Sequence, residues 1–245
     1  MSRAQCPRCM RPQSHCLCEL IPQVDSRTRV LLLQHPSEVS HALNTARLAA
    51  LGLTNAQLVV GEVFEDLATL LNPPGYRARL LFPGEDAQLI EADTVGDQQL
   101  PLLLVVPDGT WRKARKLLHL NPLLAQLPRV TLPEGAVSRY RLRKAPGPGA
   151  LSTLEAIVQA LEILEPATSF TALLRPFEAL IEGQIEAMGA DTYLKNHGDK
   201  SQSVGAGLLV MQAAGYVRET ELMRSRASPL PQGVQGFSRV FCRRM

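Results

Sequence analysis

The sequence predicts an α/β fold with a largely parallel sheet and helices on both of its faces. Short apolar runs recur between residues 29 and 132, and segments with helical spacing follow most of them. The runs 29–34 and 102–106 are the clearest, and they are apolar almost throughout, as expected of strands buried on both faces. With 245 residues, 45% of them hydrophobic, the chain is large enough to form such a core.

Four cysteines precede the first strand with the spacing C-x2-C-x6-C-x-C, and they are Cys6, Cys9, Cys16 and Cys18. Thiolates this close together in a reducing compartment favour a closed tetrahedral zinc site, which folds a segment too small to fold by itself. The alternative is a pair of disulfides, which the redox state of the cytosol disfavours. We therefore predict a zinc-binding module over residues 1–25.

The strand at 29–34 leads into polar residues that we expect at the edge of the sheet. Pro36 breaks the strand and turns the chain, which places His35 and Glu38 at the carboxyl end of the strand. Both are candidates for contact with a substrate in a cleft at this edge. For His35, the sequence alone favours the alternative of a structural histidine with its hydrogen bonds satisfied. A helix over 44–51 follows.

The later elements continue the alternation of strands and helices. Further strands are expected at 57–60, 79–82 and 129–132. Further helices are expected at 64–71, 111–120, 154–164 and 176–188. From about residue 196 the chain becomes polar, with Gly, Ser and Pro, which predicts a C-terminal extension over 196–245.

The strand at 102–106 ends in the segment Pro-Asp-Gly-Thr-Trp. This segment places a carboxylate, a hydroxyl and the only tryptophan of the chain at the carboxyl end of a central strand. In open α/β sheets, ligands bind at this end of the strands. Asp108, Thr110 and Trp111 are therefore candidates for a functional site. The alternatives are that Asp108 or Thr110 only caps the next helix and that Trp111 packs in the core.

Two clusters of basic residues contain no acid, although the net charge of the chain is only +3. The first lies in the helix that begins at Trp111 and consists of Arg112, Lys113, Arg115 and Lys116. The second lies in an alternating polar and apolar stretch and consists of Arg139, Arg141, Arg143 and Lys144. Such patches fit a polyanion, whereas a solvated surface is the alternative.

A capping box, Ser152-x-x-Glu155, opens the helix at 154–164 and follows a loop that contains prolines and glycines. The exposed amides at the start of this helix suit an anionic or carboxylate-bearing ligand. The alternative is that Ser152 and Glu155 only cap each other. The two interpretations are compatible, because a cap can also shape a pocket.

The sequence gives no sign of a membrane protein or of an exported one. It contains no run of about 18 apolar residues, which a membrane-spanning helix would need. Its first residues lack the apolar segment of a signal peptide. The cytoplasm is therefore the expected location.

Four blocks of the sequence resemble the DTW-domain family of bacterial tRNA-uridine aminocarboxypropyltransferases, which are related to SPOUT-like enzymes that modify ribosomal RNA. The blocks are the cysteine cluster, the segment 33–47 with Gln-His-Pro and Asn-Thr-Ala-Arg, the Asp-Gly-Thr-Trp motif at 108–111, and the segment 138–156. The resemblance implies a SPOUT-like catalytic domain over residues 26–195, with a trefoil knot near its C-terminal end.

The resemblance also implies a reaction. S-adenosylmethionine would donate its 3-amino-3-carboxypropyl group to N3 of a uridine in the variable loop of tRNA, and methylthioadenosine would leave. Asp108 would remove the N3 proton, and Trp111 would stack on the uracil or on the adenine of the donor. The candidates for binding the donor are Thr110, Trp111, Leu151, Ser152 and Thr153. The candidates for binding RNA are Arg112, Arg115, Arg139, Arg141, Lys144, His35 and Glu38.

Two other classes of function fit parts of the sequence. One is a SPOUT-like RNA methyltransferase that uses the same co-substrate and releases S-adenosylhomocysteine. The other is a zinc-containing RNA-binding protein without catalysis, which would tolerate the change Asp108→Asn. The expected partner is tRNA, with no role for DNA or a membrane, and the sequence does not set the oligomeric state.

Overall fold

A computed structural model of the chain describes residues 4–41, 43–93, 100–135, 138 and 151–189. The chain divides into two compact units, Met1–Gly198 and Asp199–Met245, and all of the described residues belong to the first. The predicted extension over 196–245 lies outside the described residues, as does the segment 139–150. The trefoil knot therefore stays a prediction.

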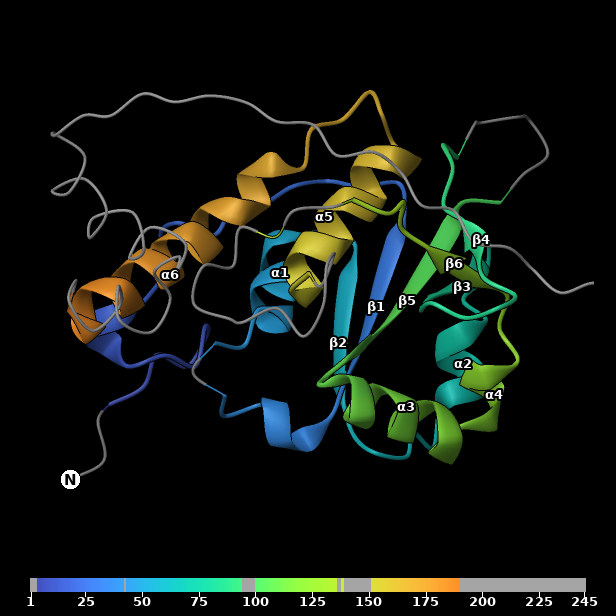
Figure 1. Cartoon of the computed structure of the whole chain (residues 1–245), viewed down its shortest axis with the longest axis horizontal. Helices are drawn as coiled ribbons and strands as arrows, with labels where there is room; N and C mark the ends of the chain where they lie inside the picture. Colours follow the sequence, from blue (N-terminus) through green and yellow to red (C-terminus); the bar gives the residue numbers. More distant parts are fainter. Residues whose placement is uncertain (1–3, 42, 94–99, 136–137, 139–150, 190–245) are drawn as a thin grey trace, which may run out of the picture. The chain divides into compact units, whose positions relative to one another are not determined.

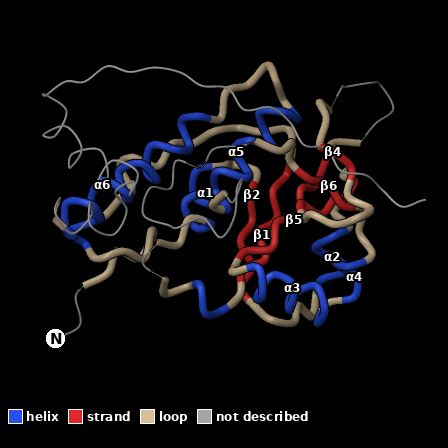
Figure 2. Tube along the Cα trace, viewed as in Figure 1, coloured by secondary structure: helices blue, strands red, loops and turns tan. Residues whose placement is uncertain are grey.

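The described part of the chain forms a parallel sheet of six strands, which confirms the predicted α/β class (Figures 1 and 2). The strand order across the sheet is β2-β1-β5-β3-β6-β4, and every neighbouring pair is parallel. The strands are β1 (Arg29–Gln34), β2 (Ala56–Val60), β3 (Arg77–Leu81), β4 (Gln88–Leu89), β5 (Leu102–Asp108) and β6 (Arg129–Thr131). The sequence did not predict β4, because its two residues are exposed and carry no apolar pattern.

Helices cover both faces of the sheet, as predicted (Figure 1). One layer contains α1 (Ala46–Gly52), α5 (Thr153–Leu164), the 3-10 turn η3 (Thr171–Leu174) and α6 (Arg175–Met188). The other layer contains α2 (Leu67–Leu71), α3 (Trp111–Leu120) and α4 (Pro122–Ala125). Two further 3-10 turns are η1 (Gln13–His15) and η2 (Pro36–Glu38).

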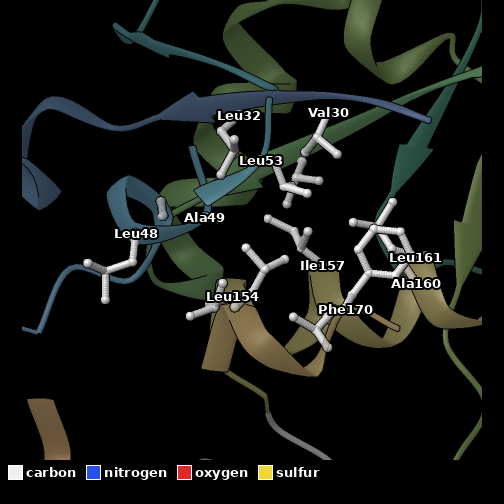
Figure 3. Packing of buried hydrophobic residues seen from close by; sticks show 14 of the residues in the cluster. Val30, Leu32, Leu48, Ala49, Leu53, Leu154, Ile157, Ala160, Leu161 and Phe170 are labelled. Carbon is white, nitrogen blue, oxygen red and sulfur yellow. The ribbon is translucent and has the colours of Figure 1, made fainter. Parts of the chain in front are cut away.

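The central strands are apolar throughout because their side chains alternate between two cores. In β1, Val30 and Leu32 pack in the core that contains α1 and α5, whereas Leu31 and Leu33 pack in the core that contains α2 and α3. Figure 3 shows Val30 and Leu32 on the side of the strand that faces Ile157 of α5. The same alternation runs along β5, so neither strand has a face left for polar residues.

The predicted helices need correction at two starts, and one short helix was not predicted. The helix expected over 44–51 is α1, which begins at Ala46 and ends at Gly52. The short helix expected to begin at Phe64 begins at Leu67, because the backbone N–H of Phe64 donates to the side chain of Asn121 in a turn (3.1 Å). The helix that begins at Trp111 ends at Leu120, as expected, but a second short helix, α4, starts at once from Pro122. Proline suits the first turn of a helix, where its missing N–H has no role.

The cysteine segment packs directly on the main domain. Cys9, Leu17 and Ile21 are buried in the same core as the side chains of α1, α5 and α6. No helix among the described residues is both long enough and apolar enough to cross a membrane.

The central position of β5 predicts the stability effect of one substitution. Leu104 is fully buried in the middle of this strand, so Leu104→Ala should lower the free energy of unfolding by about 2–5 kcal/mol. Leu89→Ala is the matched control, because Leu89 is 60% exposed on the edge strand β4 and should cost well under 1 kcal/mol. Urea denaturation followed by circular dichroism measures both changes. Equal losses in the two variants would contradict the described core.

Candidate functional site

The carboxyl ends of β1 and β5 meet at one edge of the sheet. Gln34 and Asp108 close these strands and lie opposite each other in the parallel register. The backbone N–H of His35 donates to the backbone oxygen of Asp108 (3.0 Å), so the pairing continues to the last residue of β5. Gly109 follows with φ of +152°, and a Cβ atom there would lie 3.0 Å from the Cβ of Lys113. Glycine therefore lets the chain turn from β5 into α3 close to this edge.

Asp108 is a buried carboxylate at this edge, with 7% of its surface exposed. Its Oδ2 accepts a hydrogen bond from Nε2 of Gln34 (2.8 Å), and its Oδ1 accepts one from the hydroxyl of Thr153 (2.5 Å). Burial raises the pKa of Asp108, while the hydrogen bonds from Thr153 and Gln34 act in the opposite direction. Asp108 is therefore a stronger base than an exposed aspartate, held in one orientation.

The capping box predicted at the start of α5 is confirmed. The hydroxyl of Ser152 accepts from the N–H of Glu155 (3.3 Å), and the carboxylate of Glu155 accepts from the N–H of Ser152 (2.8 Å). The hydroxyl of Ser138 also donates to both oxygens of this buried carboxylate. The cap thus fixes the position of Thr153, the first residue of α5, whose hydroxyl binds Asp108. Leu151, at the end of the preceding loop, is half-buried.

Thr110 and Trp111 begin α3 with different roles. The hydroxyl of Thr110 accepts from the N–H of Lys113 (3.4 Å), so Thr110 caps the helix, whereas Asp108 does not. Trp111 is 44% exposed and therefore is not a core residue. Its ring meets Phe82 edge to face with 5.7 Å between ring centroids, and the guanidinium of Arg129 lies 6.0 Å from the centre of the same phenyl ring.

His35 is engaged by protein groups on both sides of its ring. Its Nδ1 accepts from the backbone N–H of Ser37 (3.3 Å), so the proton of the neutral ring lies on Nε2, which is 2.8 Å from Glu62. Glu62 also pairs with Lys116 (2.6 Å), and this lysine is the main cause of the lowered pKa of Glu62. The structure thus gives His35 the satisfied hydrogen bonds of the structural alternative.

The basic residues of α3 fall into two groups. Lys113 pairs with Glu38 (2.6 Å), and Lys116 pairs with Glu62. Arg112 and Arg115 are exposed and form no ion pair with any described residue. The other predicted RNA contacts lie outside the described residues, and they are Arg139, Arg141 and Lys144.

Sequence reasoning gave no role to Gln34, which the structure places beside Asp108. The available signal was its position as the polar residue that closes an apolar strand. Reasoning from the sequence also missed Glu62, Phe82 and Arg129, which come from segments remote from the motifs. No local pattern links these residues to the edge.

The four cysteines of the N-terminal segment converge on one point. Their sulfur atoms all lie within 4.8 Å of one another, with 3.5 Å between Cys6 and Cys18 and 3.8 Å between Cys9 and Cys16. A tetrahedral zinc ion with Zn–S bonds of about 2.3 Å needs sulfur atoms about 3.8 Å apart, so the geometry fits this ion. All four thiols are free of disulfide bonds, so the alternative of two disulfides is not realised.

The ionisation of these thiols also fits a metal site. Hydrogen bonds from backbone N–H groups, chiefly that of Cys9, lower the pKa of Cys6 to about 6. Burial and the neighbouring sulfur atoms raise the pKa of Cys18 to about 12. Four thiolates this close together repel one another, and a divalent cation removes the repulsion. The residues present therefore suit a structural zinc ion.

The fold and the site define a class of protein, an α/β domain with a buried carboxylate at the carboxyl edge of a parallel sheet and a cluster of four cysteines whose geometry suits a metal ion. The DTW domain matches residues 3–185, well over half of the chain. The chain therefore belongs to the DTW domain family.

Several relatives whose names indicate an activity align with most of this chain. Proteins named tRNA-uridine aminocarboxypropyltransferase 2 are 33% identical over 194 residues in Mus musculus and 32% identical over 211 residues in Drosophila melanogaster. A protein named tRNA-uridine aminocarboxypropyltransferase A from Arabidopsis thaliana is 27% identical over 196 residues. These alignments cover 75%, 80% and 67% of this chain, in that order.

The chain corresponds to only part of some of these relatives. The alignment covers 64% of the mouse protein, 82% of the Drosophila protein and 74% of the Arabidopsis protein. No solved structure gives a significant match to the chain.

The cysteine geometry predicts that the protein purifies with about one zinc ion per chain. Cys9→Ser should abolish zinc binding and lower the melting temperature, because Cys9 is both a predicted ligand and a core residue. Ser14→Ala, a change of an exposed residue in the same segment, should keep the metal and the melting temperature. Elemental analysis and thermal unfolding measure these effects. Full zinc content in Cys9→Ser would contradict the assignment.

Proposed function

We propose that this protein, in the cytoplasm, transfers the 3-amino-3-carboxypropyl group of S-adenosylmethionine to N3 of a uridine in the variable loop of tRNA. Membership of the DTW domain family supports the proposal, and so do the names of relatives that align over most of the chain. The observation that carries it is the buried carboxylate of Asp108, which is oriented by Gln34 and Thr153 at the edge of the sheet where ligands bind.

The reaction requires a base at this position. The imide N3–H of uracil is only weakly acidic, so its proton must leave as the new N–C bond forms. The nitrogen attacks the methylene carbon next to the sulfonium, the C–S bond breaks, and methylthioadenosine leaves with the electron pair. Asp108 accepts the proton. Because burial raises the pKa of this carboxylate, it binds the proton more strongly than an exposed aspartate would.

The start of α5 offers a site for the donor. The first N–H groups of a helix have no acceptor within the helix, and they carry a partial positive charge. In α5 these groups belong to Thr153 and Leu154, next to Asp108. Binding the carboxylate of the donor there, with Leu151 and Ser152 alongside, would present its aminocarboxypropyl carbon rather than its methyl group to the nucleophile.

Exposed groups on α3 suit the RNA. The ring of Trp111 is available to stack on the uracil or on the adenine of the donor, with Thr110 fixing the start of the helix. Arg112 and Arg115 have no acidic partner among the described residues, so their charges are available for phosphate. His35 and Glu38 contribute at the same edge of the sheet by orienting their partners, Glu62 and Lys113.

The experiment that tests the proposal is incubation of the purified, zinc-containing protein with S-adenosylmethionine and bulk tRNA. Mass spectrometry of the nucleosides and of the small molecules identifies the reaction. Aminocarboxypropyl-uridine together with methylthioadenosine is the expected result. Methylated nucleoside with S-adenosylhomocysteine would contradict the proposal and identify a methyltransferase. Unchanged tRNA would also contradict it and favour an RNA-binding protein without catalysis.

The role of Asp108 predicts the effect of Asp108→Asn. This change keeps the size of the side chain and removes the base, so turnover should fall by about 10²–10⁴-fold. Binding of tRNA, measured by filter retention, should change by less than about threefold, because the buried anionic side chain of Asp108 is not a group that binds phosphate. Turnover within about tenfold of the wild-type rate would exclude Asp108 as the base.

The free arginines of α3 predict a change in the salt dependence of binding. Arg112→Ala and Arg115→Ala should each weaken tRNA binding and reduce the slope of log affinity against log salt by up to about one. Arg175→Ala is the matched control, because Arg175 is an exposed arginine at the start of α6, away from α3 (Figure 1). Binding titrations at several salt concentrations give the slopes. Equal slopes for all three variants would place the RNA elsewhere.

A further inference from the structure

A series of hydrogen bonds connects the N-terminal segment that carries Cys6, Cys9, Cys16 and Cys18, here called the cysteine module, to the edge of the sheet. Arg11 lies between Cys9 and Cys16, is buried, and is held in the module because its backbone oxygen accepts from the N–H of Cys6 (2.7 Å). Its Nη2 leaves the module and donates to the backbone oxygen of Asn44 (3.2 Å). Asn44 belongs to the segment between η2 and α1, so the module fixes a residue of the main domain.

Asn44 has its side-chain amide in a single orientation. Its Nδ2 donates to the backbone oxygen of Glu38 (3.0 Å), and its Oδ1 accepts from the backbone N–H of Arg47 (3.3 Å). If the amide were flipped, its oxygen would face the backbone oxygen of Glu38 and its NH₂ group would face the N–H of Arg47, so both bonds would be lost. The remaining lone pair of Oδ1 accepts from Nε2 of Gln34 (3.2 Å). Asn44 therefore presents an acceptor to Gln34.

The orientation of Gln34 follows from that of Asn44. Nε2 of Gln34 lies between two acceptors, Oδ1 of Asn44 and Oδ2 of Asp108, and it donates one hydrogen to each. Gln34 is fully buried, and its Oε1 has no hydrogen-bond partner among the described residues. A buried carbonyl oxygen without a donor is unfavourable. The amide of Gln34 keeps this orientation because its Nε2 donates to both Asn44 and Asp108. The amide is thus fixed with its N–H toward Asp108.

We propose that the cysteine module positions the carboxylate of Asp108 through Arg11, Asn44 and Gln34, so that the metal site supports the catalytic site and not only the local fold. This inference rests on the proposed function for the role of Asp108 as base. Arg11, Asn44 and Gln34 are positioning residues, because none of them needs to touch a substrate. Among the described residues, Asp108 accepts two hydrogen bonds from side chains, and Gln34 donates one of them. Arg11 and Asn44 keep Gln34 in the orientation that forms this bond.

Loss of this support has a predictable sign. A hydrogen bond donated to a carboxylate stabilises its charged form, so weakening the bond from Gln34 raises the pKa of Asp108. Among the described residues, the charged groups that act on Asp108 are Glu38, which raises its pKa, and His41, which lowers it, while Lys113 is paired with Glu38. Substitution of Gln34 or Arg11 leaves these groups in place, whereas substitution of Asn44 by alanine also removes the bond to the backbone oxygen of Glu38.

The test compares the titration of Asp108 in the zinc-loaded full chain and in three variants: Gln34→Met, Asn44→Ala and Arg11→Met. Carbon-13 NMR of the aspartate carboxyl groups gives the titration, and the resonance missing from Asp108→Asn identifies the residue. Gln34→Met should raise the pKa by about one unit or more, since a hydrogen bond to a charged group is lost. Asn44→Ala and Arg11→Met should shift it in the same direction by smaller amounts.

Arg8→Met is the matched control for Arg11→Met. Arg8 lies in the same module, but its side chain is exposed, so the change removes the same charge without breaking the chain of hydrogen bonds. Zinc content is measured for every variant. An Arg11→Met protein that keeps its zinc and titrates like Arg8→Met would overturn the proposal. If Arg11→Met loses its zinc or its fold, Asn44→Ala decides, and an unshifted titration of Asp108 in that variant overturns the proposal equally.

The titration needs no substrate, so it separates this inference from the proposed function. Shifted titrations in a protein that fails to modify tRNA would contradict the transferase and leave the coupling intact. An active transferase with unshifted titrations would do the reverse. In the active enzyme, the acid limb of the pH–rate profile should move to higher pH in Arg11→Met and stay in place in Arg8→Met.

Discussion

The parallel pairing of β1 with β5 is the constraint on which the site depends. Its register sets Gln34 opposite Asp108 and extends to the bond from His35, so two polar side chains meet where both strands end. A shift of β1 by one residue relative to β5 would turn the side chain of Gln34 toward the opposite face of the sheet and away from Asp108. The apolar side chains of the two strands, which alternate between two cores, are what prevents that shift.

Two opposing effects act on Asp108 and together suit it to the chemistry of a base. Burial alone would favour the neutral acid, which cannot take up a proton. The hydrogen bonds from Gln34 of β1 and Thr153 of α5 stabilise the anion, and each of them fixes one of its two oxygens. The capping box fixes the start of α5 and so the position of Thr153. The cysteine module contacts Asn44 through Arg11, and Asn44 accepts a hydrogen bond from Gln34. Segments distant in sequence thus converge on one carboxylate.

Local patterns in the sequence predict what local physics decides. The apolar strands, the capping box at Ser152 and the cysteine spacing each depend on neighbouring residues, and all three agree with the structure. The two exposed residues of β4 leave no such pattern, and the start of α2 depends on a bond from Phe64 to Asn121, which is 57 positions away. The role of Gln34 could not be predicted for the same reason, since its partners come from another strand and from the segment before α1.

The measurement that tests the role of Asp108 most directly is the pH dependence of the single-turnover rate of uridine modification in wild type and in Asp108→Asn. Hydroxide ionises the N3 imide without help from the enzyme as the solution becomes alkaline. If Asp108 removes this proton, the deficit of the variant should shrink steadily as pH rises, while circular dichroism shows both proteins folded. A deficit that stays constant across this range would show that Asp108 positions the substrates and that the proton leaves by another route.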